Sequence, residues 1–233
     1  MRFRSSNPVF KYGDFSNESS YSATYSGVAS KTGFLLAIIA LVAMYIGAEW
    51  ELMFTSFTQL IVILIAAPII AIISVIVAHK NPAIAWIFSI IYALCEGAFL
   101  GIITAIYANI YGGDVVRIAL TATFGVFASM LVLYSTGIIR VGTFFRRFMM
   151  SMLFGLIGAS LLMLILVLFS GGFTGGLYTM YVGIVVVSCI ISALYLLIDF
   201  DNISNLVSAG AGKEYEWSLS LGLTVTIVWL YIE

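Results

Sequence analysis

The chain has 233 residues, of which 62% are hydrophobic and only 9% are charged, and its mean hydropathy is +1.13. Soluble domains carry about 25% charged residues, so a water-soluble fold of this composition would lack a polar surface. The net charge of −1 gives no reason to expect nucleic-acid binding. We therefore predict an all-α membrane protein that is embedded in the lipid bilayer.

Residues 1–27 are polar and rich in Ser and Tyr, which predicts a cytoplasmic tail, and residues 28–233 then form one transmembrane domain. A membrane helix needs roughly 17 to 25 mostly apolar residues. Seven apolar runs follow one another, of which the first and the last are short, and the first would reach span length if it began near Val28. Five of the six segments between them contain Gly, Asn or Pro. In chain order the predicted helices cover 33–48, 60–78, 83–107, 118–135, 148–169, 177–198 and 217–232.

The basic residues predict the orientation of these seven helices. Nine of the ten Lys and Arg residues fall on one side of a seven-span topology, and Arg117 alone falls on the other. Cytoplasmic loops are enriched in Lys and Arg, so we expect a cytoplasmic N-terminus in a plasma-membrane protein. The nine are Arg2, Arg4, Lys11, Lys31, Lys80, Arg140, Arg146, Arg147 and Lys213.

The second and third runs contain a proline, Pro68, and an acid, Glu96, respectively. Pro68 removes a backbone donor in mid-helix and is a candidate hinge, although kinks without a gating role are common. Glu96 lies about 20 Å along its helix, where an acid costs about 2.5–3.5 kcal/mol. Ser89 and Tyr92 share its face. Glu96 either belongs to an ion or proton route, or is a protonated side chain bonded to a neighbouring helix.

Asp199 and Asp201 follow the sixth run. An acid at a helix C-terminus is opposed by the helix dipole, so the pair needs an explanation. On a continuing helix the two side chains point about 200° apart. We expect Asp199 to face the bundle interior and Asp201 to reach water or cap the next loop. The alternative is that both are merely interfacial.

The seventh run is polar or small on more than one side, which favours a central position among other helices. Core packing through Gly and Thr is the alternative. The run ends in Trp-Leu-Tyr-Ile-Glu, and this favours a truncated C-terminus over a helix that closes with a carboxylate at the outer interface. Glu216, Ser220 and Thr224 share one face, and Gly222, Thr226 and Glu233 share another.

Taken together, these features resemble the Bax inhibitor, or transmembrane Bax-inhibitor-motif, family, and its bacterial branch above all. The resemblance implies a fold of seven transmembrane helices in which the last helix is central and wrapped by the other six. The segments that carry it span nearly the whole chain. They are 4–10, 92–101 (YALCEGAFLG), 137–147, 197–201 (LIDFD) and 214–233.

The resemblance also implies an activity, a pH-sensitive calcium leak gated by a pair of carboxylates. Asp199 matches the acid of helix six and Glu233 that of the last helix, so these two would hold a proton or a passing Ca²⁺. If the register differs, Glu216 or Glu96 would be the partner of Asp199. The second run contains no Lys or Arg, so the basic latch of the family is unsupported. No permanently bound cofactor is expected.

Other function classes remain open from the sequence. A non-conducting regulator would bind a membrane protease or another partner through the polar tail. A proton-coupled transporter would use Glu96 and Asp199. An enzyme is not expected, since the chain has one histidine and no recognisable nucleophile, metal or phosphate motif. We expect a monomer or a weak homo-oligomer.

Overall fold

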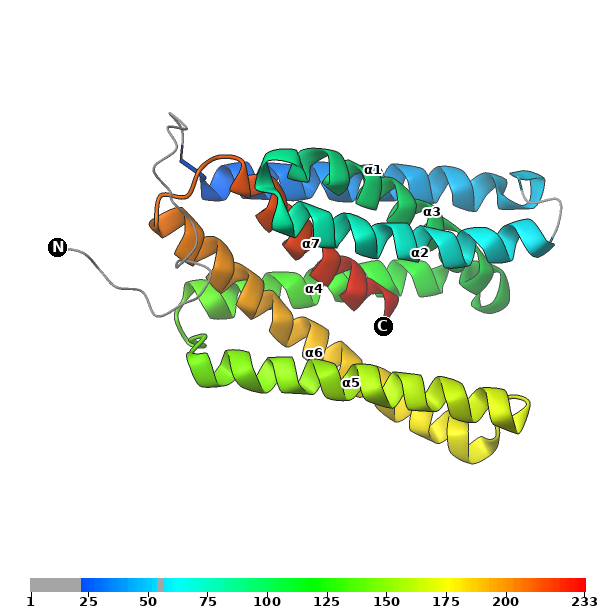
Figure 1. Ribbon diagram of the computed structural model, residues 1–233. Helices are drawn as coiled ribbons and strands as arrows, with labels where there is room; N and C mark the ends of the chain where they lie inside the picture. Colours follow the sequence, from blue (N-terminus) through cyan, green and yellow to red (C-terminus); the bar gives the residue numbers. More distant parts are fainter. Residues whose placement is uncertain (1–21, 54–56) are drawn as a thin grey trace.

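In the part of the chain that the structure describes, seven long α-helices follow one another and form a bundle (Figure 1). The computed structural model describes residues 22–53 and 57–233. Within these ranges the one β feature is an isolated bridge between Ser22 and Gly212. The helices are α1 (Tyr25–Met53), α2 (Phe57–Lys80), α3 (Ala85–Tyr111), α4 (Asp114–Ser135), α5 (Thr143–Ser170), α6 (Gly175–Ser208) and α7 (Tyr215–Ile232), with a short 3-10 helix, η2 (Pro82–Ile84), before α3.

Six of these helices, α1 to α6, are long and apolar enough to cross a membrane. The chain is therefore a multi-pass membrane protein, and the predicted set of spans is supported for six of its seven members. The remaining helix, α7, has 18 residues and carries Glu216 in its first turn. This acid and the serines and threonines that follow it dilute the apolar content of α7.

Although α7 is not among the six helices that qualify as membrane spans, it has many neighbours. It packs against α1, α2, α3, α4 and α6, and Figure 1 shows it between α2 and α4. Ser220 and Thr224 are completely buried along it, as is most of Leu221. Among the described residues, however, the α5 backbone contacts α6 alone. The predicted wrapping of the last helix by all six others is therefore not confirmed.

Helices α1 and α3 approach each other closely at two glycines of α3. A Cβ atom on Gly97 would lie 2.9 Å from the carbonyl oxygen of Ile39, and one on Gly101 would lie 2.8 Å from that of Ala43. No side chain fits at these separations. The Gly-x-x-x-Gly spacing on α3 is typical of helices that pack tightly within membranes, and it fixes the position of Glu96, the residue before Gly97.

Helices α5 and α6 form an antiparallel hairpin whose far end is separated from the other helices. Figure 1 shows α5 and the first half of α6 diverging from the other helices. Met149, Ile191 and Ile198 form their shared core. Many apolar side chains of α5 are otherwise exposed, among them Phe154, Leu161 and Leu168. Such an exterior suits lipid contact, because lipid tails are as apolar as these side chains.

The helix ends differ from the predicted ones in a consistent direction. Helix α1 begins at Tyr25, before both the start at 33 and the alternative start near Val28, and α6 continues to Ser208 instead of ending at 198. The prediction that α6 ends at the two acids was therefore wrong. An apolar run shows only the part of a helix that lies among apolar surroundings, whereas backbone hydrogen bonds continue into its polar turns.

Candidate functional site

Asp199 lies on α6 and faces α7. The Thr226 hydroxyl donates a hydrogen bond to Oδ2 of Asp199, with 2.5 Å between the two oxygens. Thr226 is buried and Asp199 is half-buried. Among the described residues Asp199 forms no ion pair. A neutral hydroxyl thus joins this carboxyl group to α7, and no cation within the described chain neutralises it directly.

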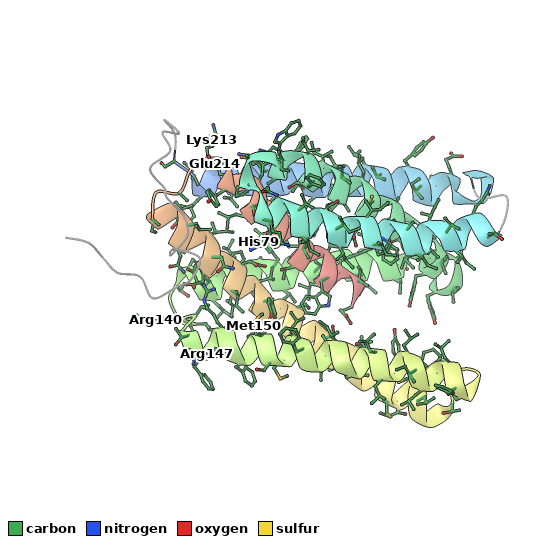
Figure 2. All side chains as sticks on the ribbon, in the orientation of Figure 1. His79, Arg140, Arg147, Met150, Lys213 and Glu214 are labelled. Carbon is green, nitrogen blue, oxygen red and sulfur yellow. The ribbon has the colours of Figure 1, made fainter. Side chains whose placement is uncertain are left out.

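A cavity of about 610 Å³ opens beside Asp199. Its wall includes three residues with neutral oxygen-bearing side chains, Tyr195, Asn202 and Ser218, together with Asp199. The basic residues Arg146 and His79 also line it. Figure 2 labels His79, which lies in the last turn of α2. Carboxylate, amide and hydroxyl oxygens are the ligands that Ca²⁺ takes in proteins. The remaining lining residues are Met150, Ile198, Asn205, Leu206, Tyr215, Leu219 and Gly222.

Asp201, two residues along α6, is held quite differently. It forms an ion pair with Arg146 of α5 and accepts hydrogen bonds from Asn205, at 3.0 Å, and from the Tyr134 hydroxyl, at 3.4 Å. The same guanidinium donates to Oδ1 of Asn202 at 2.7 Å. Arg146 therefore neutralises Asp201 and ties α5 to α6.

Because α6 continues past Asp199 and Asp201, these acids do not lie at a helix C-terminus, where the helix dipole would disfavour them. The last turn of α6 is formed by residues 205–208, so Asp199 and Asp201 lie inside the helix, before the end where the dipole acts. The two acids point to different sides of α6, one toward Thr226 and the other toward Arg146. Neither residue caps the following loop.

Glu216, a candidate partner of Asp199, is bound elsewhere. Its side chain is 1% exposed and forms an ion pair with Lys31 of α1. The backbone N–H and the hydroxyl of Thr24 also donate to its Oε1, at 2.9 and 3.1 Å. Lys31 lies 5.5 Å from the Trp217 ring centroid. Glu216 thus holds the start of α1 against the start of α7, a role that the sequence analysis missed.

Glu233, the predicted partner of Asp199, contacts α6 at a position far from Asp199. Its Oε1 accepts hydrogen bonds from the Ser188 hydroxyl, at 2.6 Å, and from the Trp229 indole N–H, at 3.1 Å. Ser188 precedes Asp199 by eleven residues of one helix, or about 16 Å. The structure does not bring Asp199 and Glu233 together.

Glu96 and Pro68 meet at a second cavity. Glu96 is 8% exposed on α3, and Pro68 lies within α2, which continues through it. Both line a cavity between α2, α3 and α7. The predicted hinge action of Pro68 stays a prediction. The arrangement separates Glu96 from the Asp199 cavity, because the two cavities have no lining residue in common.

A resident metal ion needs several protein ligands at once. Across residues 22–53 and 57–233, no three or more His, Cys, Asp or Glu side chains are grouped to hold one. The single carboxylate of Asp199, with neutral oxygens around its cavity, suits weak and transient contact with a cation.

Comparisons with known proteins identify the chain at the level of a family. A family model described as Bax inhibitor 1 like matches residues 7–233, which is almost the whole sequence. No curated protein and no solved structure matches the chain.

Proposed function

Because the chain belongs to the Bax inhibitor 1 like family, we propose that it is a pH-sensitive leak for Ca²⁺ across the plasma membrane, controlled by protonation of Asp199. One observation carries this proposal. The Asp199 carboxyl group borders a cavity whose wall includes several polar side chains, and among the described residues a neutral hydroxyl is what joins it to α7.

The chemistry of that position suggests how the gate works. A protonated Asp199 is neutral and remains against Thr226, so that α6 and α7 stay together. An ionised Asp199 without a paired cation is costly in a poorly solvated place. Its charge draws water and a cation into the cavity, and flux rises as the pH rises.

The contacts of Arg146 support the choice of Asp199 as the acid that a cation would meet. Its guanidinium lines the cavity of Asp199, yet it is engaged by Asp201 and Asn202. Asp201 therefore offsets much of its charge. A cation that enters the cavity meets Asp199 as the acid without an ion pair of its own.

The orientation remains that of the sequence analysis, with the N-terminus in the cytoplasm. Figure 2 labels Arg140, Arg147 and Lys213 at one end of the bundle, the end at which Figure 1 places the start of α1. Basic residues gathered at one end favour the cytoplasmic side. The Asp199 cavity would then open toward the cytoplasmic half of the bundle.

Calcium flux into proteoliposomes tests the proposal. Wild type should admit Ca²⁺ slowly at acidic pH and faster at mildly alkaline pH, whereas Asp199→Asn should lose this dependence. Asp114→Asn is the matched control, because Asp114 is an exposed acid at the start of α4. An absence of flux at every pH would favour the regulator, and deletion of residues 1–21 should then abolish partner binding.

A further inference from the structure

The cavity at Glu96 is a second place where ligand chemistry is available. It has a volume of about 470 Å³ and lies between α2, α3 and α7. Its wall is apolar except around Glu96 and Tyr92, and Trp229 adds an indole ring. Drug-sized ligands occupy cavities of about 300–1,000 Å³. The other lining residues are Pro68, Ala71, Ile72, Val75, Ile76, Val225, Val228 and Ile232.

The Glu96 side chain has no partner among the described residues, although it is more than nine-tenths buried. No hydrogen bond or ion pair within residues 22–53 and 57–233 reaches its carboxyl group, so no donor from a neighbouring helix bonds to it there. An acid in mid-helix is costly within a membrane and usually marks a functional position. Glu96 lines the cavity between α2, α3 and α7, which is the open space beside this side chain.

Aromatic rings complete the chemistry around this acid. Tyr92 lies one turn before Glu96 on the same face of α3, and Trp229 approaches from α7. The faces of such rings attract cations. One carboxylate, two aromatic rings and an apolar wall together match a cation with an apolar body. They do not match an anion, which Glu96 would repel.

The cavity can be reached from the lipid side. Ile72 and Ile76 line it from α2 and are 60% and 48% exposed, respectively. In a bilayer this surface faces lipid tails, and amphipathic amines and other lipophilic cations concentrate there. We propose that the α2–α3–α7 cavity binds lipophilic organic cations, with Glu96 as the counter-charge and the rings of Tyr92 and Trp229 against the cationic centre.

Binding of radiolabelled tetraphenylphosphonium to the full chain in lipid nanodiscs tests this proposal, with empty nanodiscs as the baseline. Tetraphenylborate has a similar shape and the opposite charge, so it serves as the matched probe. Wild type should bind the phosphonium saturably and should discriminate against the borate. Glu96→Gln, which keeps the side-chain shape, should weaken phosphonium binding by at least about tenfold.

Two further variants keep the test decisive. Asp114→Asn also removes one negative charge, but on the exposed surface, and should bind as wild type does. Ile72→Trp narrows the cavity from the lipid side while Glu96 stays intact, and should weaken binding even if Glu96→Gln fails to fold. Wild-type affinity in folded Glu96→Gln or in Ile72→Trp, or equal binding of tetraphenylborate, would overturn the proposal.

Discussion

The α1–α7 junction and the α6–α7 junction each place an acid against a neighbouring helix, yet they treat the charge in opposite ways. At the first, Glu216 is enclosed with Lys31 and two donors from Thr24. At the second, Asp199 receives one bond from the neutral Thr226 and borders a cavity. A buried acid that pairs with a cation holds two helices together, whereas Asp199, which has no ion pair among the described residues, is the acid to which we assign the response to protons and passing ions.

The largest effect on stability is expected from breaking the ion pair between Lys31 and Glu216. Lys31→Met leaves Glu216 buried without its cation, which should lower the free energy of unfolding by about 3 kcal/mol. Thermal unfolding in detergent would measure the loss. The double variant Lys31→Met with Glu216→Gln removes both charges and should recover much of it, because neither buried charge is then unpaired. Equal stability of Lys31→Met and wild type would contradict the role given to this pair.

A smaller loss is expected where α3 holds α1. Gly97→Ala places a Cβ atom 2.8 Å from Cβ of Val42 and 2.9 Å from the carbonyl oxygen of Ile39. Such overpacking should destabilise the bundle by about 2 kcal/mol, measured by the same unfolding assay. Gly125→Ala is the control, since nothing lies within 4 Å of a Cβ atom on this α4 glycine. A loss as large in Gly125→Ala would attribute the effect to the helix backbone instead of the α1–α3 contact.

The ion pair between α5 and α6 should be weaker than the one between α1 and α7. Arg146 and Asp201 are 33% and 18% exposed, respectively, so water shares in their solvation. Arg146→Gln should therefore lower stability by only about 1 kcal/mol. Arg117→Gln, in a pair that is almost fully exposed, should leave the unfolding temperature unchanged. A larger loss for Arg146→Gln than for Lys31→Met would reverse the ranking of the two ion pairs.

The smallest effect on stability, and the most specific one on flux, is expected at Thr226. Thr226→Val keeps the shape but removes the donor to Asp199, and should lower stability by about 0.5 kcal/mol. The pH dependence of Ca²⁺ flux should change with it. Thr224→Val makes the same substitution at a buried threonine whose hydroxyl donates to the Ser220 carbonyl of its own helix. Flux that responds equally to both variants would remove Asp199 from the explanation.

Much of this fold was predictable because bilayer thickness and hydropathy constrain membrane helices strongly. The six helices that qualify as spans each contain one predicted apolar run. The polar ends were missed because composition alone cannot show where backbone bonding stops. Residues 199–208 continue α6 through two acids, of which the Arg146 contact neutralises one.

The candidate site was predictable in part only. The separation of Asp199 from Asp201 followed from the angle between neighbouring residues on a helix. Contacts between distant segments did not follow, since 185 residues separate Lys31 from Glu216 and a single sequence carries no signal for that pairing beyond opposite charge. The match of Glu233 to Asp199 rested on motif order, whereas the structure places Glu233 beside Ser188.

The most direct test of the central claim is the ratio of Ca²⁺ flux at mildly alkaline pH to flux at acidic pH in three proteins: wild type, Asp199→Asn and Asp201→Asn. The two variants change neighbouring acids of one helix, only one of which faces Thr226. The account predicts a ratio well above one for wild type and Asp201→Asn, and a ratio near one for Asp199→Asn. A wild-type ratio that persists in Asp199→Asn would contradict it.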